Sequence, residues 1–303
     1  MTDLSVNIAG IKFKNPIIAA SGCFAFGREF DQVYDISKLG GISCSGVTLK
    51  ERPGNPPPRV FETSSGMINS VGLQNKGIEY FIEKDLPFLN SKDLRIIVNI
   101  SGNSPDEYAK LAEILDKEKI DMIELNVSCP NIKKGGRCFG TSKEDLKHIL
   151  YDVKSITSKK IMVKLTPNVT DVAEIAKCCE DNGADALSLV NTFTAMRIDI
   201  DNFRPKLKNN TGGLSGPAIF PIAIRMVNDV FNAVNIPVVG MGGIVKGNDA
   251  IEMIIAGANA VQVGTANFIK PDICLDILEE MKKYCLDKNI KSLEEIIGKV
   301  KLW

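Results

Sequence analysis

The 303-residue sequence lacks an excess of charge of either sign, because 37 Lys and Arg balance 37 Asp and Glu. It therefore has no basic surplus of the kind that binds nucleic acid or an anionic membrane. It also has no run of about 18 consecutive apolar residues, so no transmembrane helix is predicted. The N-terminal "MTDLSVNIAG" has no basic region followed by an apolar core. We therefore expect no signal peptide and a cytoplasmic location.

Histidine is almost absent, since His148 is the only one, and it falls within a predicted helix. A Ser-His-Asp or Cys-His catalytic site is therefore disfavoured, and we expect His148 on a helix surface. Eight cysteines are present, but none forms a C-x-x-C pair. In a chain of this length without a signal peptide they indicate free thiols rather than disulfides, zinc or an iron–sulfur cluster.

What the sequence does contain is a series of short apolar runs along its whole length. Each is rich in Val, Ile or Leu and lacks strict polar alternation, as expected for strands buried on both faces of a parallel sheet. The runs span residues 16–21, 41–48, 95–101, 122–128, 161–167, 186–192, 236–243 and 260–266.

Amphipathic helices are predicted between many of these runs, at 104–119, 141–157, 171–183 and 248–258. The first begins with Ser104 as N-cap and Pro105 in the first turn. Thr141 and Glu144 have the spacing of a capping box. Gly183 is placed as the glycine that follows a helix end.

Strand and helix alternating about eight times predict an α/β fold, a (β/α)8 TIM barrel formed as a single domain over residues 1–303. The segment "LSVNIAGIKFKNP" is predicted to be a hairpin that closes the bottom of the barrel. A doubly wound open sheet is the second interpretation. It is less favoured because no G-x-G-x-x-G follows the first run.

Two long stretches, 50–77 and 191–221, are rich in Pro, Gly, Asn and Ser and are predicted to be loops. Loops of this length in a compact domain are usually functional or disordered. Both follow predicted strands, so they should lie on the C-terminal face of the barrel, where the active sites of such barrels are found.

Polar side chains collect where the predicted strands stop: Ser21, Ser45, Asn99, Asn126, Lys164 and Asn191. A buried Lys or Asn without a partner costs several kcal/mol. Any single Asn is commonly a turn or a strand cap. Six polar residues at the same end of one barrel instead indicate that they pair with each other or with a ligand.

Lys164 lies inside the apolar "VKL" and has three interpretations: a structural cation, a Schiff-base nucleophile, or a positive charge facing an anionic group. Glycine turns end the seventh and eighth predicted strands, in "GMGGI" and "GTA", where barrel enzymes commonly bind phosphate. "TGGLSG" adds a third glycine-rich stretch on the same face.

Cys129, in "IELNVSCPN", follows a predicted strand end directly. The simpler interpretation is a buried thiol, which is common for cysteine in cytoplasmic proteins. However, Cys129 also lies on the predicted active face, before the Gly-containing "NIKKGGRCFGT". A free thiol has a pKa of about 8.5, so modest tuning would make it a base near neutral pH.

Eight motifs, in order along the chain, resemble the catalytic subunit of the dihydroorotate dehydrogenase family. They are "NPIIAASGCFAFGREF", "ERPGNPPPRVFET", "GMINSVGLQNKG", "ELNVSCPN", "VKLTPNVTD", "TGGLSGPAI", "GMGGI" and "VGTANF". "SGCFAFG", "GLQN" and "TGGLSGPAI" most resemble the type 1B branch. In that branch an FMN-containing barrel works with a partner subunit that carries FAD and a 2Fe–2S cluster and passes electrons to NAD+.

The resemblance implies oxidation of dihydroorotate to orotate in pyrimidine biosynthesis, with Cys129 removing the C5 proton and FMN taking the C6 hydride. The implied substrate residues are Ser45, Asn69, Ser70, Val71, Gly72, Leu73, Asn126, Asn191 and Thr192. The implied FMN residues are Ser21, Ser45, Gly46, Asn99, Asn126, Lys164, Val190, Gly216, Gly242, Gly243, Gly264 and Thr265. A homodimeric core that joins electron-transfer subunits into a heterotetramer is also expected.

One position departs from the family pattern: Ser45 stands where the family normally has a lysine. Ser45 keeps a hydroxyl but carries no charge, and Lys50 is not at the matching position. We therefore expect weaker binding of flavin or substrate, or a slower reaction, on an unchanged fold. The alternatives are a flavin-binding subunit of low or no activity, a type 1A-like enzyme that uses fumarate, and an aldolase that uses Lys164.

Overall fold

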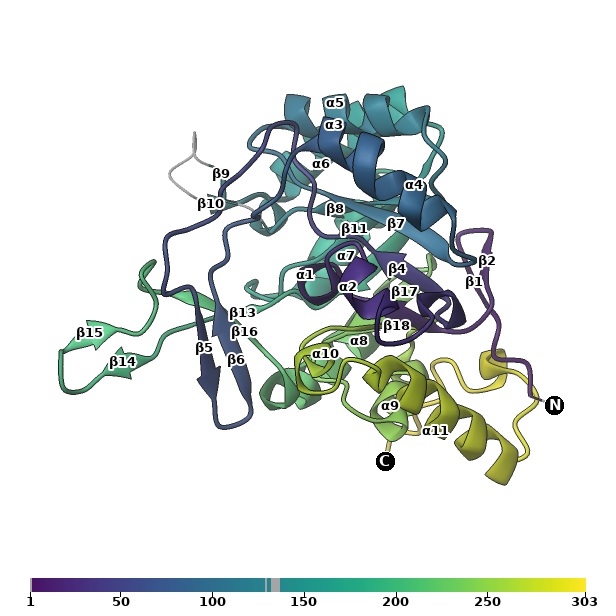
Figure 1. Cartoon of the computed structure of the whole chain (residues 1–303). Helices are drawn as coiled ribbons and strands as arrows, with labels where there is room; N and C mark the ends of the chain where they lie inside the picture. Colours follow the sequence, from purple (N-terminus) through teal and green to yellow (C-terminus); the bar gives the residue numbers. More distant parts are fainter. Residues whose placement is uncertain (1, 129, 132–136) are drawn as a thin grey trace.

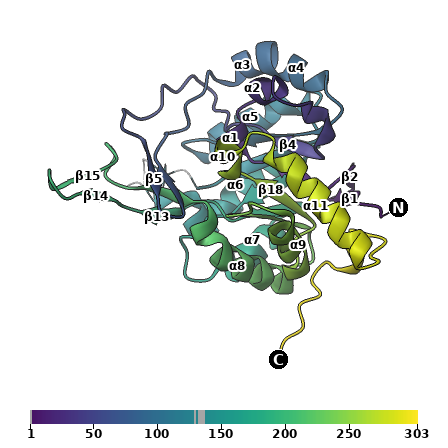
Figure 2. The same cartoon turned by 60° about the horizontal axis from the view of Figure 1, so that its bottom comes forward.

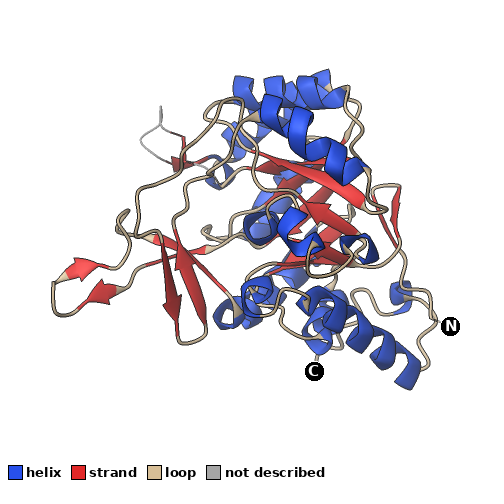
Figure 3. Cartoon of the chain, in the orientation of Figure 1, coloured by secondary structure: helices blue, strands red, loops and turns tan. Residues whose placement is uncertain are grey.

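The computed structural model describes residues 2–128, 130–131 and 137–303 (Figure 1). Eight parallel strands close into a barrel, and they follow one another around it in chain order (Figures 1 and 3). They are β3 (Ile17–Ala19), β4 (Gly41–Ser43), β7 (Arg95–Ile100), β8 (Met122–Asn126), β11 (Lys160–Lys164), β12 (Ala186–Leu189), β17 (Val238–Met241) and β18 (Ala260–Val263). Each predicted apolar run coincides with one of these strands, with β11 beginning one residue before its run, so the predicted barrel is confirmed.

Helices surround the barrel and connect its strands (Figure 2). Their bounds are α1 (Ser21–Phe24), α2 (Arg28–Asp31), α3 (Ile78–Tyr80), α4 (Leu86–Asn90), α5 (Pro105–Asp116), α6 (Lys143–Ile156), α7 (Val172–Asp181), α8 (Phe220–Ala233), α9 (Gly247–Ala256), α10 (Ala266–Ile269) and α11 (Ile273–Asp287). In the part of the chain that the structure describes, no helix is both long and apolar enough to cross a bilayer.

The N-termini of α5 and α6 test the two predicted helix caps. Ser104 caps α5 as predicted, because its side chain accepts a hydrogen bond from the backbone N–H of Glu107. The capping box predicted at Thr141 and Glu144 is wrong. Thr141 belongs to the short 3₁₀ turn η4 (Phe139–Thr141), so Ser142 becomes the N-cap of α6 and accepts from the N–H of Asp145 at 3.2 Å.

The remaining single-residue predictions agree with the structure. Gly183 follows α7 with a φ of +88°, a left-handed conformation that favours glycine. His148 is exposed on α6. The seven described cysteines are free thiols.

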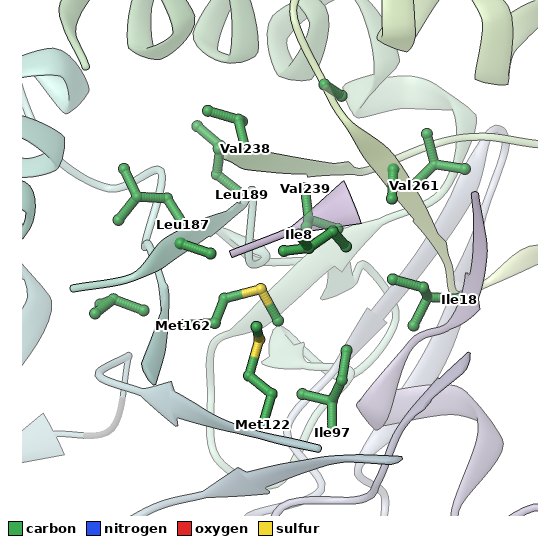
Figure 4. Close-up of a cluster of buried hydrophobic side chains, with 14 of the residues drawn as sticks. Ile8, Ile18, Ile97, Met122, Met162, Leu187, Leu189, Val238, Val239 and Val261 are labelled. Carbon is green, nitrogen blue, oxygen red and sulfur yellow. The ribbon is translucent and has the colours of Figure 1, made fainter. Parts of the chain in front are cut away.

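The core fills the barrel and the space between barrel and helices. Figure 4 shows a cluster that includes Ile18, Ile97, Met122 and Met162 from four barrel strands, all fully buried. Because side chains alternate across a strand, residues two positions further along share the same face. The face that carries Ile97, Met122 and Met162 therefore also carries Asn99, Glu124 and Lys164.

The N-terminal hairpin pairs β1 (Val6–Ile8) with β2 (Ile11–Phe13), as predicted. Ile8 is fully buried and belongs to the hydrophobic core (Figure 4). The Arg95 side chain, at the start of β7, donates to the carbonyl of Lys12 at 2.7 Å. The hairpin is thus attached at the end of the barrel where the strands begin.

The prediction that 50–77 and 191–221 are only loops is wrong, because they pair with each other. β5 (Val60–Thr63), β6 (Gly66–Asn69), β13 (Phe193–Ala195) and β16 (Gly212–Ser215) form a four-stranded antiparallel sheet. β14 (Ile198–Asp199) pairs with β15 (Arg204–Pro205), and this hairpin projects from the body of the molecule in both views (Figures 1 and 2). These strands were missed because they are short, glycine-containing and paired with a distant segment.

A further short antiparallel pair, β9 (Pro130–Asn131) with β10 (Arg137–Cys138), lies between β8 and α6. Cys129, the predicted catalytic base, lies outside the described residues.

Candidate active site

A cavity of about 370 Å³ opens between the carboxyl ends of the barrel strands and the four-stranded sheet. This volume is within the range of small-molecule sites. Every residue predicted to bind substrate or cofactor contributes to its walls. They are Ser21, Ser45, Gly46, residues 69–73, Asn99, Asn126, Lys164, residues 190–192, Gly216, Gly242, Gly243, Gly264 and Thr265.

The strand register explains why these residues converge. Lys164 of β11 is level with Asn126 of β8 on one side and with Ser188 of β12 on the other. Parallel strands in register must end at the same rim, so polar residues placed at strand ends in the sequence meet in space. The six polar residues named from the sequence all lie on this cavity.

Sequence reasoning missed a buried acidic residue beneath the cavity. Glu124 of β8 is fully buried, and its carboxylate accepts four hydrogen bonds from four other strands. Two reach Oε2, from Ser43 Oγ at 2.8 Å and Asn99 Nδ2 at 2.5 Å. Two reach Oε1, from Ser188 Oγ at 2.7 Å and Gln262 Nε2 at 2.8 Å.

The sequence did carry a signal for this network. Glu124 interrupts the apolar "MIELNVS", and Gln262 interrupts "AVQVGTA", much as Lys164 interrupts "VKL". Gln262 also lines the cavity. An acidic or amide residue within a fully buried strand needs partners, so these two positions belong to the same class as the six that were named.

Lys164 stabilises the ionised form of Glu124. Burial raises the pKa of the Glu124 carboxyl, but Lys164 and the hydrogen bonds from Asn99, Ser188 and Gln262 outweigh burial and bring that pKa below its ordinary value. Lys164 is 6% exposed, and its Nζ donates to Ser21 Oγ at 3.2 Å. The barrel interior thus contains an ionised carboxylate and a cation just below the cavity.

Amide groups line the cavity next to Lys164. Asn191 Nδ2 donates to Asn126 Oδ1 at 3.3 Å. The backbone carbonyl of Asn126 accepts from the hydroxyl of Tyr108 at 2.7 Å. This bond ties the end of β8 to α5 and fixes the backbone of the segment that leads toward Cys129.

The four-stranded sheet forms the opposite wall. Asn69 of β6 faces Gly213 of β16, and the Asn69 side chain donates to the Gly213 carbonyl at 3.5 Å. Thr265, which follows β18, donates through its hydroxyl to Ser215 Oγ of β16 at 2.8 Å. This contact joins the sheet to the barrel rim, so the wall has a fixed position relative to the strand ends.

The glycines after β17 are required by their surroundings. Gly242 and Gly243 have φ of +121° and +81°, where other residues are strained. A Cβ on Gly243 would stand 2.7 Å from Phe220 Cβ and 2.9 Å from the carbonyl oxygen of Gly216. The backbone therefore packs against Gly216 and Phe220 more closely here than a side chain would permit. Gly242 and Gly243 also line the cavity, where backbone without side chains suits an anionic ligand group.

Two further residues clarify the chemistry of the rim. Cys23, which sequence reasoning did not name, lines the cavity, and burial raises its pKa to about 11 although Lys164 opposes the rise. It is therefore a neutral thiol at neutral pH. Lys50 is exposed and is absent from the described cavity lining, so it does not replace the charge missing at Ser45.

Comparison with known proteins matches the chain to a single family. The family model described as dihydroorotate dehydrogenase matches residues 3–285. The chain is 52% identical over 300 residues to a Thermoanaerobacter sp. (strain X514) protein and 54% identical over 298 residues to one from Petrotoga mobilis. A protein from Bacteroides thetaiotaomicron is 49% identical over 299 residues. Each alignment covers at least 98% of both chains, and each relative is named dihydroorotate dehydrogenase B (NAD(+)), catalytic subunit.

Replacing Lys164 with methionine tests the charge pairing. Without the cation, burial should raise the pKa of Glu124 above its ordinary value, so the ionised carboxylate becomes a cost that grows as the pH rises. We expect a loss of about 3 kcal/mol in the free energy of unfolding at pH 8 and a smaller loss at pH 5. Denaturant unfolding at both pH values measures this difference.

The matched control is Lys160→Met at the other end of β11. Its side chain is 47% exposed and pairs with Asp185 at 3.0 Å. We expect a loss below about 1 kcal/mol at both pH values, as is usual for an exposed ion pair. Equal losses for Lys164→Met at pH 5 and pH 8 would contradict the proposed dependence of Glu124 on Lys164.

Proposed function

The chain belongs to the dihydroorotate dehydrogenase family, and on that premise we propose how its residues divide the work of the reaction. It is the catalytic subunit of an NAD+-linked dihydroorotate dehydrogenase of pyrimidine synthesis, which oxidises dihydroorotate to orotate. The observation that carries the proposal is the cavity. Sequence identity to the relatives extends along the whole chain, and all the binding residues that the family resemblance implies line this one cavity.

FMN is the cofactor that fits this cavity, within one FMN-binding barrel domain. When bound, FMN supplies the acceptor for the hydride that leaves C6 of the substrate. The fit is supported by buried oxygens that need a ligand: Asn99 Oδ1, Gln262 Oε1 and Ser70 Oγ have no hydrogen-bond partner among the described residues. The residues that would hold it are Ser21, Ser45, Gly46, Asn99, Asn126, Lys164, Val190, Gly216, Gly242, Gly243, Gly264 and Thr265.

Lys164 and the glycine turns match the two ends of FMN, the isoalloxazine ring and the phosphate. The buried Lys164 cation offers electrostatic stabilisation to an electron-rich ring system. Gly242 and Gly243 line the cavity with backbone that carries no side chain, which suits its phosphate. The Schiff-base interpretation of Lys164 finds less support, because its Nζ donates to Ser21 and sits beside the Glu124 network.

Substrate would lie between the barrel rim and the four-stranded sheet. Residues 69–73 of the sheet wall face Asn126, Asn191 and Thr192 of the rim across the same cavity. Amide side chains both donate and accept, which suits a ring that carries a carboxylate, carbonyl oxygens and N–H groups. Ser45 adds a hydroxyl to this set.

Cys129 would remove the C5 proton of dihydroorotate. Its support comes from the motif "ELNVSCPN" and from the preceding residue, because Ser128 lines the cavity. A thiol with a pKa near 8.5 is a suitable base at neutral pH when its environment lowers that value modestly.

The electrons would then pass to a partner. The relatives' names specify a catalytic subunit, which implies a second subunit, and the type 1B motifs suggest that it carries FAD and a 2Fe–2S cluster. A homodimer of this chain with two electron-transfer subunits, in the cytoplasm, is the assembly we propose. The same names favour NAD+ over fumarate as the final acceptor.

An absorption spectrum of the purified chain, before and after anaerobic addition of dihydroorotate, tests the function. We expect a flavin band that bleaches with substrate. A flavin band that does not bleach would support a flavin-holding subunit without activity. A protein that stays colourless after FMN is added would contradict the assignment of the cofactor, and trapping with borohydride and a carbonyl substrate would then test Lys164 as a Schiff base.

The substitution Cys129→Ala tests the base. We expect FMN binding to persist and flavin reduction to slow by about 10²–10⁴-fold, the usual contribution of a general base. Stopped-flow absorbance measures the rate. Cys178→Ala on α7 is the matched control, since that thiol lies outside the cavity lining and should leave the rate unchanged. Normal turnover by Cys129→Ala would show that another group takes the proton.

The substitution Ser45→Lys tests the departure from the family. A cation at this cavity position should raise FMN affinity or the rate of flavin reduction by about tenfold, because a hydrogen bond to a charged group contributes more than one between neutral groups. Flavin fluorescence titration and stopped-flow kinetics measure both quantities. Lys50→Met, which changes an exposed lysine nearby, should alter neither; an unchanged Ser45→Lys protein would refute the hypothesis.

A further inference from the structure

The Glu124 network does more than satisfy a buried charge. Each oxygen of the carboxylate receives one hydroxyl and one side-chain amide, so all four donors are ordered around it. Glu124 itself does not line the cavity, whereas both amide residues, Asn99 and Gln262, do. The carboxylate therefore lies one layer below the site. Its hydrogen bonds reach the cavity lining only through these two side chains, and its charge also interacts with Lys164.

The two amides have their orientation imposed by the charge. An ionised carboxylate only accepts hydrogen bonds, so Asn99 and Gln262 must each turn the NH2 group toward Glu124. The carbonyl oxygen of each amide must then point away from Glu124. A neutral partner at position 124, able both to donate and to accept, would permit either orientation.

The carbonyl oxygens are left for a ligand. Asn99 is fully buried and Gln262 is 1% exposed, yet Asn99 Oδ1 and Gln262 Oε1 have no hydrogen-bond partner within the described chain. Asn99 Oδ1 lies at the cavity wall, since a Cβ on Gly46 would stand 3.2 Å from it. Two buried acceptors without donors are costly, so the site as built calls for N–H groups from whatever fills it.

We propose that Glu124 is a positioning residue that fixes Asn99 and Gln262 as two hydrogen-bond acceptors, which share the single ring N–H of the flavin in a three-centre hydrogen bond. This inference rests on the proposed function, because it takes the flavin as the occupant of the cavity. The oxidised isoalloxazine ring has one N–H, at N3, between two carbonyl groups. A cavity wall that presents these two carbonyl oxygens binds a ring with that N–H more tightly than a ring without it.

The test compares binding of FMN with binding of 3-deaza-FMN, in which a carbon atom replaces N3 and the N–H donor between the two carbonyl groups is lost. Binding is measured by quenching of flavin fluorescence in the full-length chain. The parent protein should prefer FMN by about 10- to 100-fold, the effect of leaving buried acceptors unpaired. Glu124→Gln keeps the shape of the side chain but places a donating NH2 group beside one of the two amides. That amide must then turn its carbonyl oxygen toward position 124 and its NH2 group toward the cavity, so the preference should fall below about threefold.

Two control variants separate orientation from simple destabilisation. Ser43→Ala and Ser188→Ala each remove one donor from the same carboxylate but leave both amides in place. Neither serine lines the cavity. Both controls should retain the parent preference for FMN even if they lower stability, since damage to packing weakens both flavins alike.

Failure of this inference and failure of the proposed function give different results. A parent protein that binds both flavins equally, a Glu124→Gln protein that retains the full preference, or a Ser43→Ala protein that loses it equally would overturn the role of Glu124. A parent protein that binds neither flavin would overturn the proposed function as well. If Glu124→Gln does not fold, Gln262→Met removes one acceptor directly, and an unchanged preference in that variant would again refute the inference.

Discussion

The closed parallel barrel imposes the constraint on which the rest of this protein depends. Eight strands in register must all begin at one end and finish at the other, so every residue at a strand end is delivered to the same rim. Lys164, Asn126 and Ser188 lie level on three adjacent strands for this reason. The interior is then divided along its axis. Apolar side chains such as Met122 and Met162 form one layer (Figure 4), and Glu124 and Lys164, two residues further along the same strands, lie nearer to the rim.

Glu124 lies between the apolar layer and the polar residues of the rim. An isolated carboxylate in this position would be too costly to ionise, but four hydrogen bonds and the Lys164 cation make ionisation favourable. The consequence reaches the cavity, because a carboxylate that only accepts dictates the orientation of the amides around it. A charge that never touches the ligand can in this way decide which hydrogen bonds the ligand must make.

The second wall of the site has a different origin. It is built from two long connections, after β4 and after β12, which would be unstable strands on their own and gain order by pairing with each other. The hydroxyl contact between Thr265 and Ser215 then attaches the resulting sheet to the rim. The rim and residues of the sheet thus line one cavity. Ser45 lines this cavity as well.

The sequence by itself determined the eight barrel strands, four of the helices and the polar rim of the barrel. These features are local: an apolar run, a Ser-Pro helix start or a lysine inside "VKL" expresses its preference without distant partners. The family resemblance also came from the sequence, as did the residues around the cavity. The tertiary structure alone decided the pairing of β6 with β16, the true cap of α6 at Ser142, and the partners of Glu124. Gln262 lies 138 residues from Glu124 along the chain and on the opposite side of the barrel, so only closure of the barrel brings the two within 2.8 Å.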